Sequence, residues 1–144
     1  MSISSRFAVG IHILTFIELN KGKVSSSDYI AKSVNTNPAL IRKMMGMLKR
    51  AGLIEVHPGI AGAKLAKKPS EITLLDVYKA VNVVRENQLF RIHEHPNPNC
   101  PVGRNIQHSI EPIFAAAQLE MENFLKKITL ENIVEDIAKK EEIG

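Results

Sequence analysis

Residues 25–52, SSSDYIAKSVNTNPALIRKMMGMLKRAG, decide the fold that we predict for this chain of 144 residues. The serines at 25–27 begin a short helix, because a hydroxyl oxygen accepts one of the unpaired backbone N–H groups of a first turn. Asn35 marks the turn after this helix, since asparagine adopts left-handed backbone more readily than most side chains. Asn37 and Pro38 then fit the N-cap and the first position of a second helix. The stretch therefore predicts two helices joined by a tight turn.

The second of these helices has one apolar stripe and is basic elsewhere. The stripe recurs at i, i+3, i+4 and i+7 and consists of Ile41, Met44, Met45 and Leu48. The other faces hold Arg42, Lys43, Gly46, Lys49 and Arg50, and Gly52 ends the helix. Ala31, Asn35 and Ile41 have the spacing of a helix-turn-helix, in which a small residue lets the two helices approach.

A helix-turn-helix places the start of its second helix in the major groove of DNA, the only groove wide enough to admit one. The residues predicted to read base edges there are Asn37, Ala39, Arg42 and Lys43. Contacts to DNA phosphates are predicted for Ser4, Ser5, Arg6, Lys49, Arg50 and Lys64. The alternative is a plain helical hairpin with solvated lysines.

The flanking segments complete the unit. Residues 4–19 predict a helix, capped by Ser4 or Ser5, that is apolar nearly all round and so needs cover on more than one face, which points to a second subunit. Residues 53–56 and 64–66 predict a two-stranded hairpin that forms a wing. Thr73 caps a further helix with Leu74, Val77, Tyr78 and Val81 on its inner side.

A long helix dominates the rest of the chain. Apolar residues keep helical spacing from Ile106 to Ile128, and we expect Pro112 to bend or restart this helix. Thr129 caps a short last helix.

Charge is distributed unevenly along the sequence. The formal net charge is +4, but residues 1–79 carry +7 and residues 80–144 carry −3. A basic first part indicates an anionic partner, such as double-stranded DNA, for the front of the molecule. A random scatter of surface lysines is the alternative.

Composition and motifs exclude several classes of protein. A single cysteine rules out an internal disulfide framework and fits a reducing cytoplasm, where we expect the protein to be located. The sequence has no apolar run near the roughly 18 residues of a membrane span, so we expect no membrane partner. It also lacks the motifs of serine hydrolases, zinc proteases and phosphate-binding loops, so we do not expect an enzyme. The GIAG pattern at 59–62 leads into a strand, whereas the similar loop of an RNA-binding KH domain joins two helices.

Residues 51–81, AGLIEVHPGIAGAKLAKKPSEITLLDVYKAV, resemble the Rrf-two family of winged helix-turn-helix regulators, most closely in the segment EITLLDVYKAV. The segments SSRFA at 4–8 and CPVG at 100–103 resemble the start of that family and the last of its three cysteines. The resemblance covers nearly the whole chain. It implies a homodimeric bacterial transcription regulator, usually a repressor, held together by the long helix after Gly103.

Three departures from the family pattern matter. The cluster-binding members carry three closely spaced cysteines, whereas only Cys100 is present here, so we expect neither an iron–sulfur cluster nor another cofactor. The wing segment at 57–63 is one residue shorter than the usual run and lacks its arginine, which weakens the case for minor-groove insertion. The start of the recognition helix at 37–43 is more basic than usual and implies a different operator.

The fold class is therefore mainly α: a winged helix-turn-helix domain with a small two-stranded β-wing and a long C-terminal dimerisation helix. We expect residues 1–82 to form the DNA-binding domain and residues 83–102 a sensor and linker loop. Residues 103–144 then form the dimerisation helix and the short terminal helix.

By analogy with the family, the sensor lies around residues 86–103. Cys100 just precedes a helix start, where the dipole and the unpaired N–H groups lower a thiol pKa, so it is a candidate regulatory thiol that forms an intersubunit or mixed disulfide. An inert cysteine is the alternative. A metal site built from His93, His95, Cys100 and His108 is a weaker hypothesis that we do not adopt, and a small-molecule effector remains open.

These patterns together predict a sequence-specific transcription regulator, acting as a repressor, that binds a pseudo-palindromic operator as a homodimer. The alternative is a winged-helix protein-interaction module without specific DNA binding.

Overall fold

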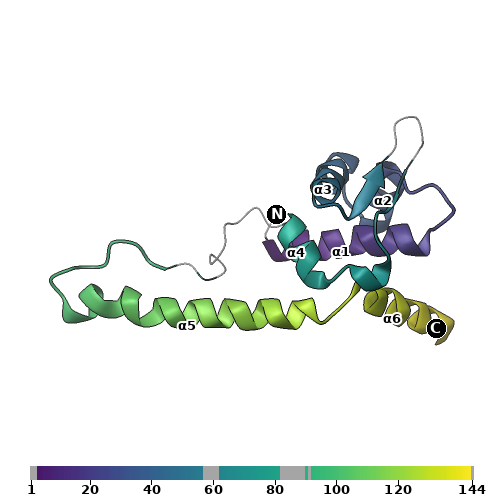
Figure 1. The fold of residues 1–144 in the computed structure, drawn as a ribbon. Helices are drawn as coiled ribbons and strands as arrows, with labels where there is room; N and C mark the ends of the chain where they lie inside the picture. The colour runs from purple at the N-terminus through teal and green to yellow at the C-terminus, as the bar shows by residue number, and fades with distance from the viewer. Residues whose placement is uncertain (1–2, 57–61, 82–89, 91, 144) are drawn as a thin grey trace. The chain divides into compact units, whose positions relative to one another are not determined.

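The computed structural model describes residues 3–56, 62–81, 90 and 92–143 (Figure 1). The chain divides into two compact units, one comprising residues 1–83 with 126–144 and the other residues 84–125. The first unit contains α1 (Ile3–Leu19), α2 (Ser27–Val34), α3 (Pro38–Arg50), β1 (Ile54–Val56), β2 (Ala63–Leu65), the 3-10 turn η1 (Pro69–Glu71), α4 (Leu74–Val81) and α6 (Leu130–Ile143). The second unit holds α5 (Pro101–Lys126) up to its last residue.

The predicted caps of the helix-turn-helix are confirmed. The Ser26 hydroxyl accepts from the N–H of Tyr29 at 3.3 Å and starts α2. Asn35 adopts left-handed backbone with φ of 64° and ends that helix. The Asn37 side-chain oxygen then accepts from the N–H of Leu40 at 2.9 Å, with Pro38 in the first turn of α3. Ser26 and Asn37 each pair with a backbone N–H that the helix itself leaves unpaired.

The apolar stripe of α3 lies in the core of the first unit. Every residue of the predicted stripe is buried, and Met47 joins them. The stripe packs against α2, α4 and β1. Burial of this kind, rather than intrinsic helix propensity, holds a 13-residue helix in place.

Helix α1 crosses the unit and is covered by its own chain. Ile13 and Leu14 are fully buried, and α1 packs against α2, α4, α6 and β2. Gly10 permits the contact with α4, because a Cβ at this position would lie 3.0 Å from a methyl group of Val81. The cap predicted at Ser4 or Ser5 is wrong, since the helix already begins at Ile3.

The hairpin is antiparallel and anchored to the turn between α1 and α2. Ile54 pairs with Leu65 and Glu55 with Lys64. The N–H of Ala63 donates to the Ser25 carbonyl at 3.3 Å. Gly62 has φ of 98°, and a Cβ there would lie 2.8 Å from the Ser25 nitrogen, so the position requires glycine. The predicted tip of the wing, residues 57–61, lies outside the described residues.

Helices α4 and α6 start side by side in the first unit. Thr73 and Asp76 exchange cap hydrogen bonds of 2.9 and 3.1 Å at α4, and Thr129 caps α6 through Asn132. The N–H of Leu130, a fully buried residue, donates to the Ile72 carbonyl at 2.8 Å. The short terminal helix is thus part of the first unit. This differs from the expected range 103–144, which grouped it with the long helix.

The second unit is built on α5, a single helix of 26 residues. It continues through Pro112, so the alternative that the proline restarts the helix is wrong. The rings of Phe90 and Phe114 lie 5.2 Å apart within this unit. None of the helices in the described part of the chain is long and apolar enough to cross a membrane.

Candidate nucleic-acid interface

The predicted base-reading residues lie together at the start of α3, and all are exposed: Asn37, Ala39, Arg42 and Lys43. The side-chain oxygen of Asn37 is occupied by its cap bond to Leu40. Its amide NH₂ group is therefore the part of the side chain that suits an acceptor on a base. The sequence of α3 contains no acidic residue, so the helix presents an uninterrupted basic surface.

A groove of about 350 Å³ separates α3 from the hairpin. It is lined by Ser26, Ser27, Arg42, Met45, Gly46, Lys49, Val56 and Gly62. Arg42 and Lys49 are seven residues apart, two turns along the same side of α3. The structure thus joins one predicted base-reading residue and one predicted phosphate contact in a single groove between recognition helix and wing.

The remaining predicted phosphate contacts are spread over three elements. Arg50 is exposed at the end of α3, and Lys64 is exposed on β2. Ser5 and Arg6 lie in the first turns of α1, exposed and half-buried respectively. Ser4 lies in the same helix, but its side chain is not among those described. None of the residues in α1 lines the groove beside α3.

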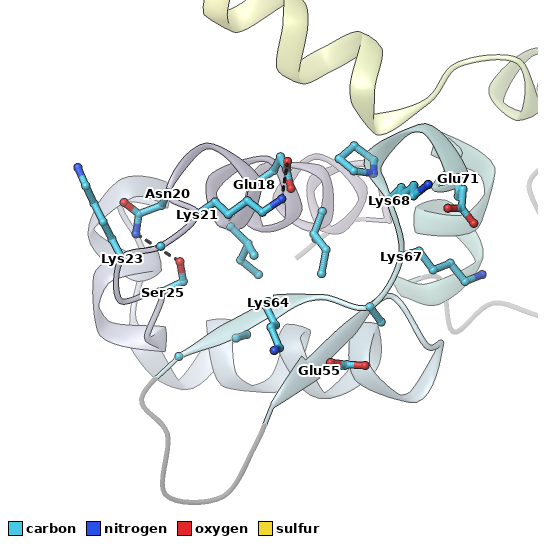
Figure 2. Close-up of a pocket in the computed structure, with 17 residues that line it drawn as sticks. Glu18, Asn20, Lys21, Lys23, Ser25, Glu55, Lys64, Lys67, Lys68 and Glu71 are labelled. Carbon is cyan, nitrogen blue, oxygen red and sulfur yellow. Dashed lines mark hydrogen bonds and ion pairs between the residues drawn. The ribbon is translucent and has the colours of Figure 1, made fainter.

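A second, larger cleft of about 670 Å³ lies between the end of α1, the turn after it and the open edge of β2 (Figure 2). Five lysines line it: Lys21, Lys23, Lys64, Lys67 and Lys68. Of these, only Lys64 was predicted from the sequence as a contact to DNA. The sequence contains the other lysines as two closely spaced pairs, at 21 and 23 and at 67 and 68. Only the fold shows that both segments face one cleft.

Cys100 caps the start of α5 with its sulfur. The backbone N–H groups of Gly103 and Val102 hold the pKa of the Cys100 thiol below its usual value, because they hydrogen-bond the thiolate. The Cys100 N–H donates to the Asn97 carbonyl at 3.3 Å. A Cβ on Gly103 would collide with that same carbonyl oxygen, so glycine is needed for this tight loop. The predicted direction of the pKa shift is confirmed.

The histidines considered with Cys100 do not form a metal site. His93, His95 and His108 are exposed, and no group of three His, Cys, Asp or Glu side chains suited to a metal occurs in the described residues. Iron–sulfur clusters are held mainly by cysteine thiolates, and the chain contains one cysteine. The donor set of this chain therefore does not fit such a cluster.

Helices α1–α4 with a two-stranded hairpin, and an exposed basic second helix in the helix-turn-helix, define a winged-helix DNA-binding protein of the transcription-regulator class. The family model Rrf2, described as an iron-dependent transcriptional regulator, matches residues 3–136. The chain belongs to the Rrf2 (Rrf-two) family, as the resemblance implied.

Individual relatives agree with this assignment. YwnA of Bacillus subtilis (strain 168), named as an HTH-type transcriptional regulator, is 44% identical over 132 residues, which is 92% of this chain and 96% of YwnA. A solved structure named as a DNA-binding protein has a TM-score of 0.72 and 40% identity, and the match covers 89% of this chain and 97% of that one. The fold is also that of CymR from B. subtilis, with a TM-score of 0.63 at 20% identity over 94% and 97% of the two chains. The chain is thus a transcriptional regulator, and its relatives are named as regulators rather than enzymes.

Proposed function

We propose that this protein is a transcriptional repressor that binds a pseudo-palindromic operator as a homodimer. Two copies of α3 enter successive major grooves, roughly one helical turn of DNA apart, and block access to a promoter. Asn37, Ala39, Arg42 and Lys43 read bases, while the basic residues at the ends of α1, α3 and β2 fix the position on phosphates. Double-stranded DNA and a second copy of the chain are the partners, and the site of action is the cytoplasm.

The observation that carries the proposal is the exposed basic side of α3. Four cations on this helix are exposed, namely Arg42, Lys43, Lys49 and Arg50, while its apolar stripe is fully used by the core. Because its buried side holds α3 in the core, the exposed side of this helix can enter the major groove of DNA without a loss of folding stability. The dimer is supported by α5, which exposes large apolar residues along its length.

Fluorescence anisotropy tests the proposal directly. The reduced protein is titrated on DNA from upstream of its own gene and on a scrambled duplex of equal length, each at two salt concentrations. We expect a steep salt dependence on both and a preference of about 10³-fold or more for the upstream DNA. Absence of binding to either duplex at low salt would favour the alternative, a winged-helix protein-interaction module.

Cys100 is the proposed redox switch of this regulator. Its lowered thiol pKa and partial exposure are the properties of a reactive cysteine. Peroxide takes two electrons and two protons from two thiols, one in each subunit, and is reduced to two molecules of water as the S–S bond forms. A mixed disulfide with a small thiol is the alternative product. Either one alters the start of α5 and so the geometry of the dimer.

Alkylation of Cys100 by iodoacetamide across a range of pH measures this property, and the single cysteine of the chain makes the signal unambiguous. A lowered pKa means that the reactive thiolate is present at lower pH in the folded protein than in the same protein in denaturant. The Gly103→Ala variant displaces the Asn97 carbonyl, so its alkylation midpoint should move back toward the denatured value. Identical midpoints in folded and denatured protein would contradict a tuned thiol.

A further inference from the structure

The lysine-lined cleft has the construction of a ligand site. Its volume of about 670 Å³ lies within the range of small-molecule pockets, roughly 300–1,000 Å³. Ile17, which is 3% exposed, and the half-buried Leu65 give it an apolar floor. Figure 2 shows Lys21, in the turn after α1, with its side chain beside Glu18 on one side of the cleft, and Lys64 on β2 at the other side.

The charge of the cleft favours an anion. Its lining contains five lysines against three glutamates, Glu18, Glu55 and Glu71. Lys21 lies 4.0 Å from Glu18, and Glu55 is the cross-strand neighbour of Lys64. The lining thus carries two more positive than negative charges.

The open edge of β2 supplies backbone groups to the same cleft. The Ala66 N–H donates to the Leu53 carbonyl at 3.0 Å, which makes these two residues a hydrogen-bonded pair of the antiparallel ladder. Hydrogen-bonded pairs alternate along such a ladder, so Glu55 and Lys64 form the next one. Leu65, between them, therefore turns its N–H away from β1 and toward the cleft that it lines.

We propose that this cleft is an effector site that binds a small organic anion with an apolar body. The anionic group lies among Lys21, Lys64 and the Leu65 N–H, and the apolar body covers Ile17. The cleft ends where Ala63 and Gly62 contact Ser25, the joint that fixes the wing to the rest of the domain. A ligand there changes the position of the wing and neutralises Lys64, and so weakens DNA binding. The effect of the ligand on DNA binding rests on the proposed function, whereas the binding of the anion to the cleft does not.

An apolar floor distinguishes this cleft from a phosphate-tracking DNA surface. No residue of α3 is part of its lining, whereas α3 supplies four residues to the smaller groove. The lysines of the cleft would nevertheless attract DNA phosphates as well as a small anion. The test must therefore distinguish these two occupants.

Binding is tested without DNA by titrating the full chain with anilinonaphthalene sulfonate, an aromatic anion whose fluorescence rises in apolar surroundings. The Lys21→Ala/Lys64→Ala variant removes the two lysines that the proposal places at the anionic group and should bind the dye about five-fold more weakly. The matched control, Lys79→Ala/Lys139→Ala, removes the same charge from exposed positions outside the cleft and should bind like the wild type. Equal affinities for all three proteins overturn the proposal, as does equally tight binding of the uncharged analogue N-phenylnaphthylamine. A third variant, Ala66→Phe, fills the cleft without changing its charge and should weaken binding at least ten-fold.

The effector role is tested on a duplex that carries a red fluorophore. Saturating anilinonaphthalene sulfonate should weaken DNA binding about five-fold, and by linkage DNA should weaken dye binding by the same factor and then no further. A dye dissociation constant that keeps rising in proportion to duplex concentration means that DNA itself occupies the cleft, and overturns the small-ligand proposal. Dye binding that leaves DNA affinity unchanged overturns the effector role. If the protein binds no DNA, the dye titrations still decide the binding step, so the two failures are distinguishable.

Discussion

Helices α3 and α5 are both amphipathic, but they differ in what their apolar residues contact. Five of the 13 residues of α3 are buried apolar side chains. In α5, which is 26 residues long, the one buried residue is Gln118. Its exposed apolar residues include Val102, Ile113, Leu119 and Phe124, each more than half exposed. The chain alone completes the packing of α3, whereas it leaves apolar residues of α5 exposed, and in the proposed function a second copy covers them.

The largest expected effect comes from placing a charge on the exposed apolar side of α5. Ile113 lies on the same side of the helix as Val102 and Phe124, because these positions are separated by 11 residues, close to three full turns. Ile113→Asp should separate the homodimer, because an isolated carboxylate would be buried in the interface. A two-fold interface contains each substitution twice, so about 2 kcal/mol per subunit becomes about 4 kcal/mol, or roughly a thousandfold in the dimer dissociation constant. Sedimentation equilibrium measures this constant.

Leu19→Asp is the matched control for Ile113→Asp. Leu19, at the end of α1, is 50% exposed and Ile113 is 64% exposed, so both substitutions replace an exposed aliphatic side chain. We expect Leu19→Asp to leave the dimer intact. If both variants dissociate equally, or neither does, the side of α5 that carries Ile113 is not the dimer interface.

A core substitution in α3 should cost stability regardless of protein concentration. Leu48 is fully buried, so Leu48→Ala removes apolar contacts and leaves a cavity that costs about 3 kcal/mol, or roughly 10 °C in melting temperature. Ile113→Ala should instead lower the melting temperature only through the dimer, and its effect should shrink as protein concentration rises. Calorimetry at two concentrations measures both. A concentration-independent loss for Ile113→Ala would mean that α5 is packed within its own chain.

Substitutions on the exposed side of α3 should change DNA recognition rather than the stability of the fold. Arg42→Ala should weaken operator binding by about 1–3 kcal/mol and relax specificity at one base position. Lys49→Ala, in the same groove, should weaken binding to operator and random DNA alike and reduce the salt dependence by about one unit. Anisotropy titrations on both duplexes measure the difference. Equal losses on operator and random DNA for Arg42→Ala would refute its base-reading role.

The same contrast explains what the sequence predicted well. The caps at Ser26, Asn37 and Thr73 and the turn at Asn35 were predictable because each depends on bonds within four residues of the chain. The core stripe of α3 was predictable because periodicity identifies a buried side without naming its neighbours.

Features that depend on distant contacts were not predictable. From the sequence, the last helix was grouped with the long helix in one range, 103–144. In the structure, the N–H of Leu130 at its start donates to the carbonyl of Ile72, 58 positions earlier in the chain. The lysine cleft joins residues near 21 with residues near 67 through the strand register. At Pro112 the sequence left a bend and a restart of the helix open, and the structure excludes the restart, because α5 continues through this residue.

The smallest expected effects concern two glycines, Gly46 in α3 and Gly52 just after it. At both there is room for a side chain, but only one has a backbone conformation that suits it. Gly46 lies inside α3, and among the described residues a Cβ there would meet only the Arg50 side chain, at an ordinary contact distance of 3.5 Å. Gly46→Ala should therefore stabilise the protein by about 0.5–1 kcal/mol, because glycine loses more conformational freedom on folding. Gly52 also has open space around it, but its φ is +76°. Gly52→Ala should destabilise by about 1 kcal/mol, since a side chain strains this backbone. Denaturant titrations of both variants give the two signs, and a gain at both positions would show that the backbone after α3 relaxes out of its left-handed conformation.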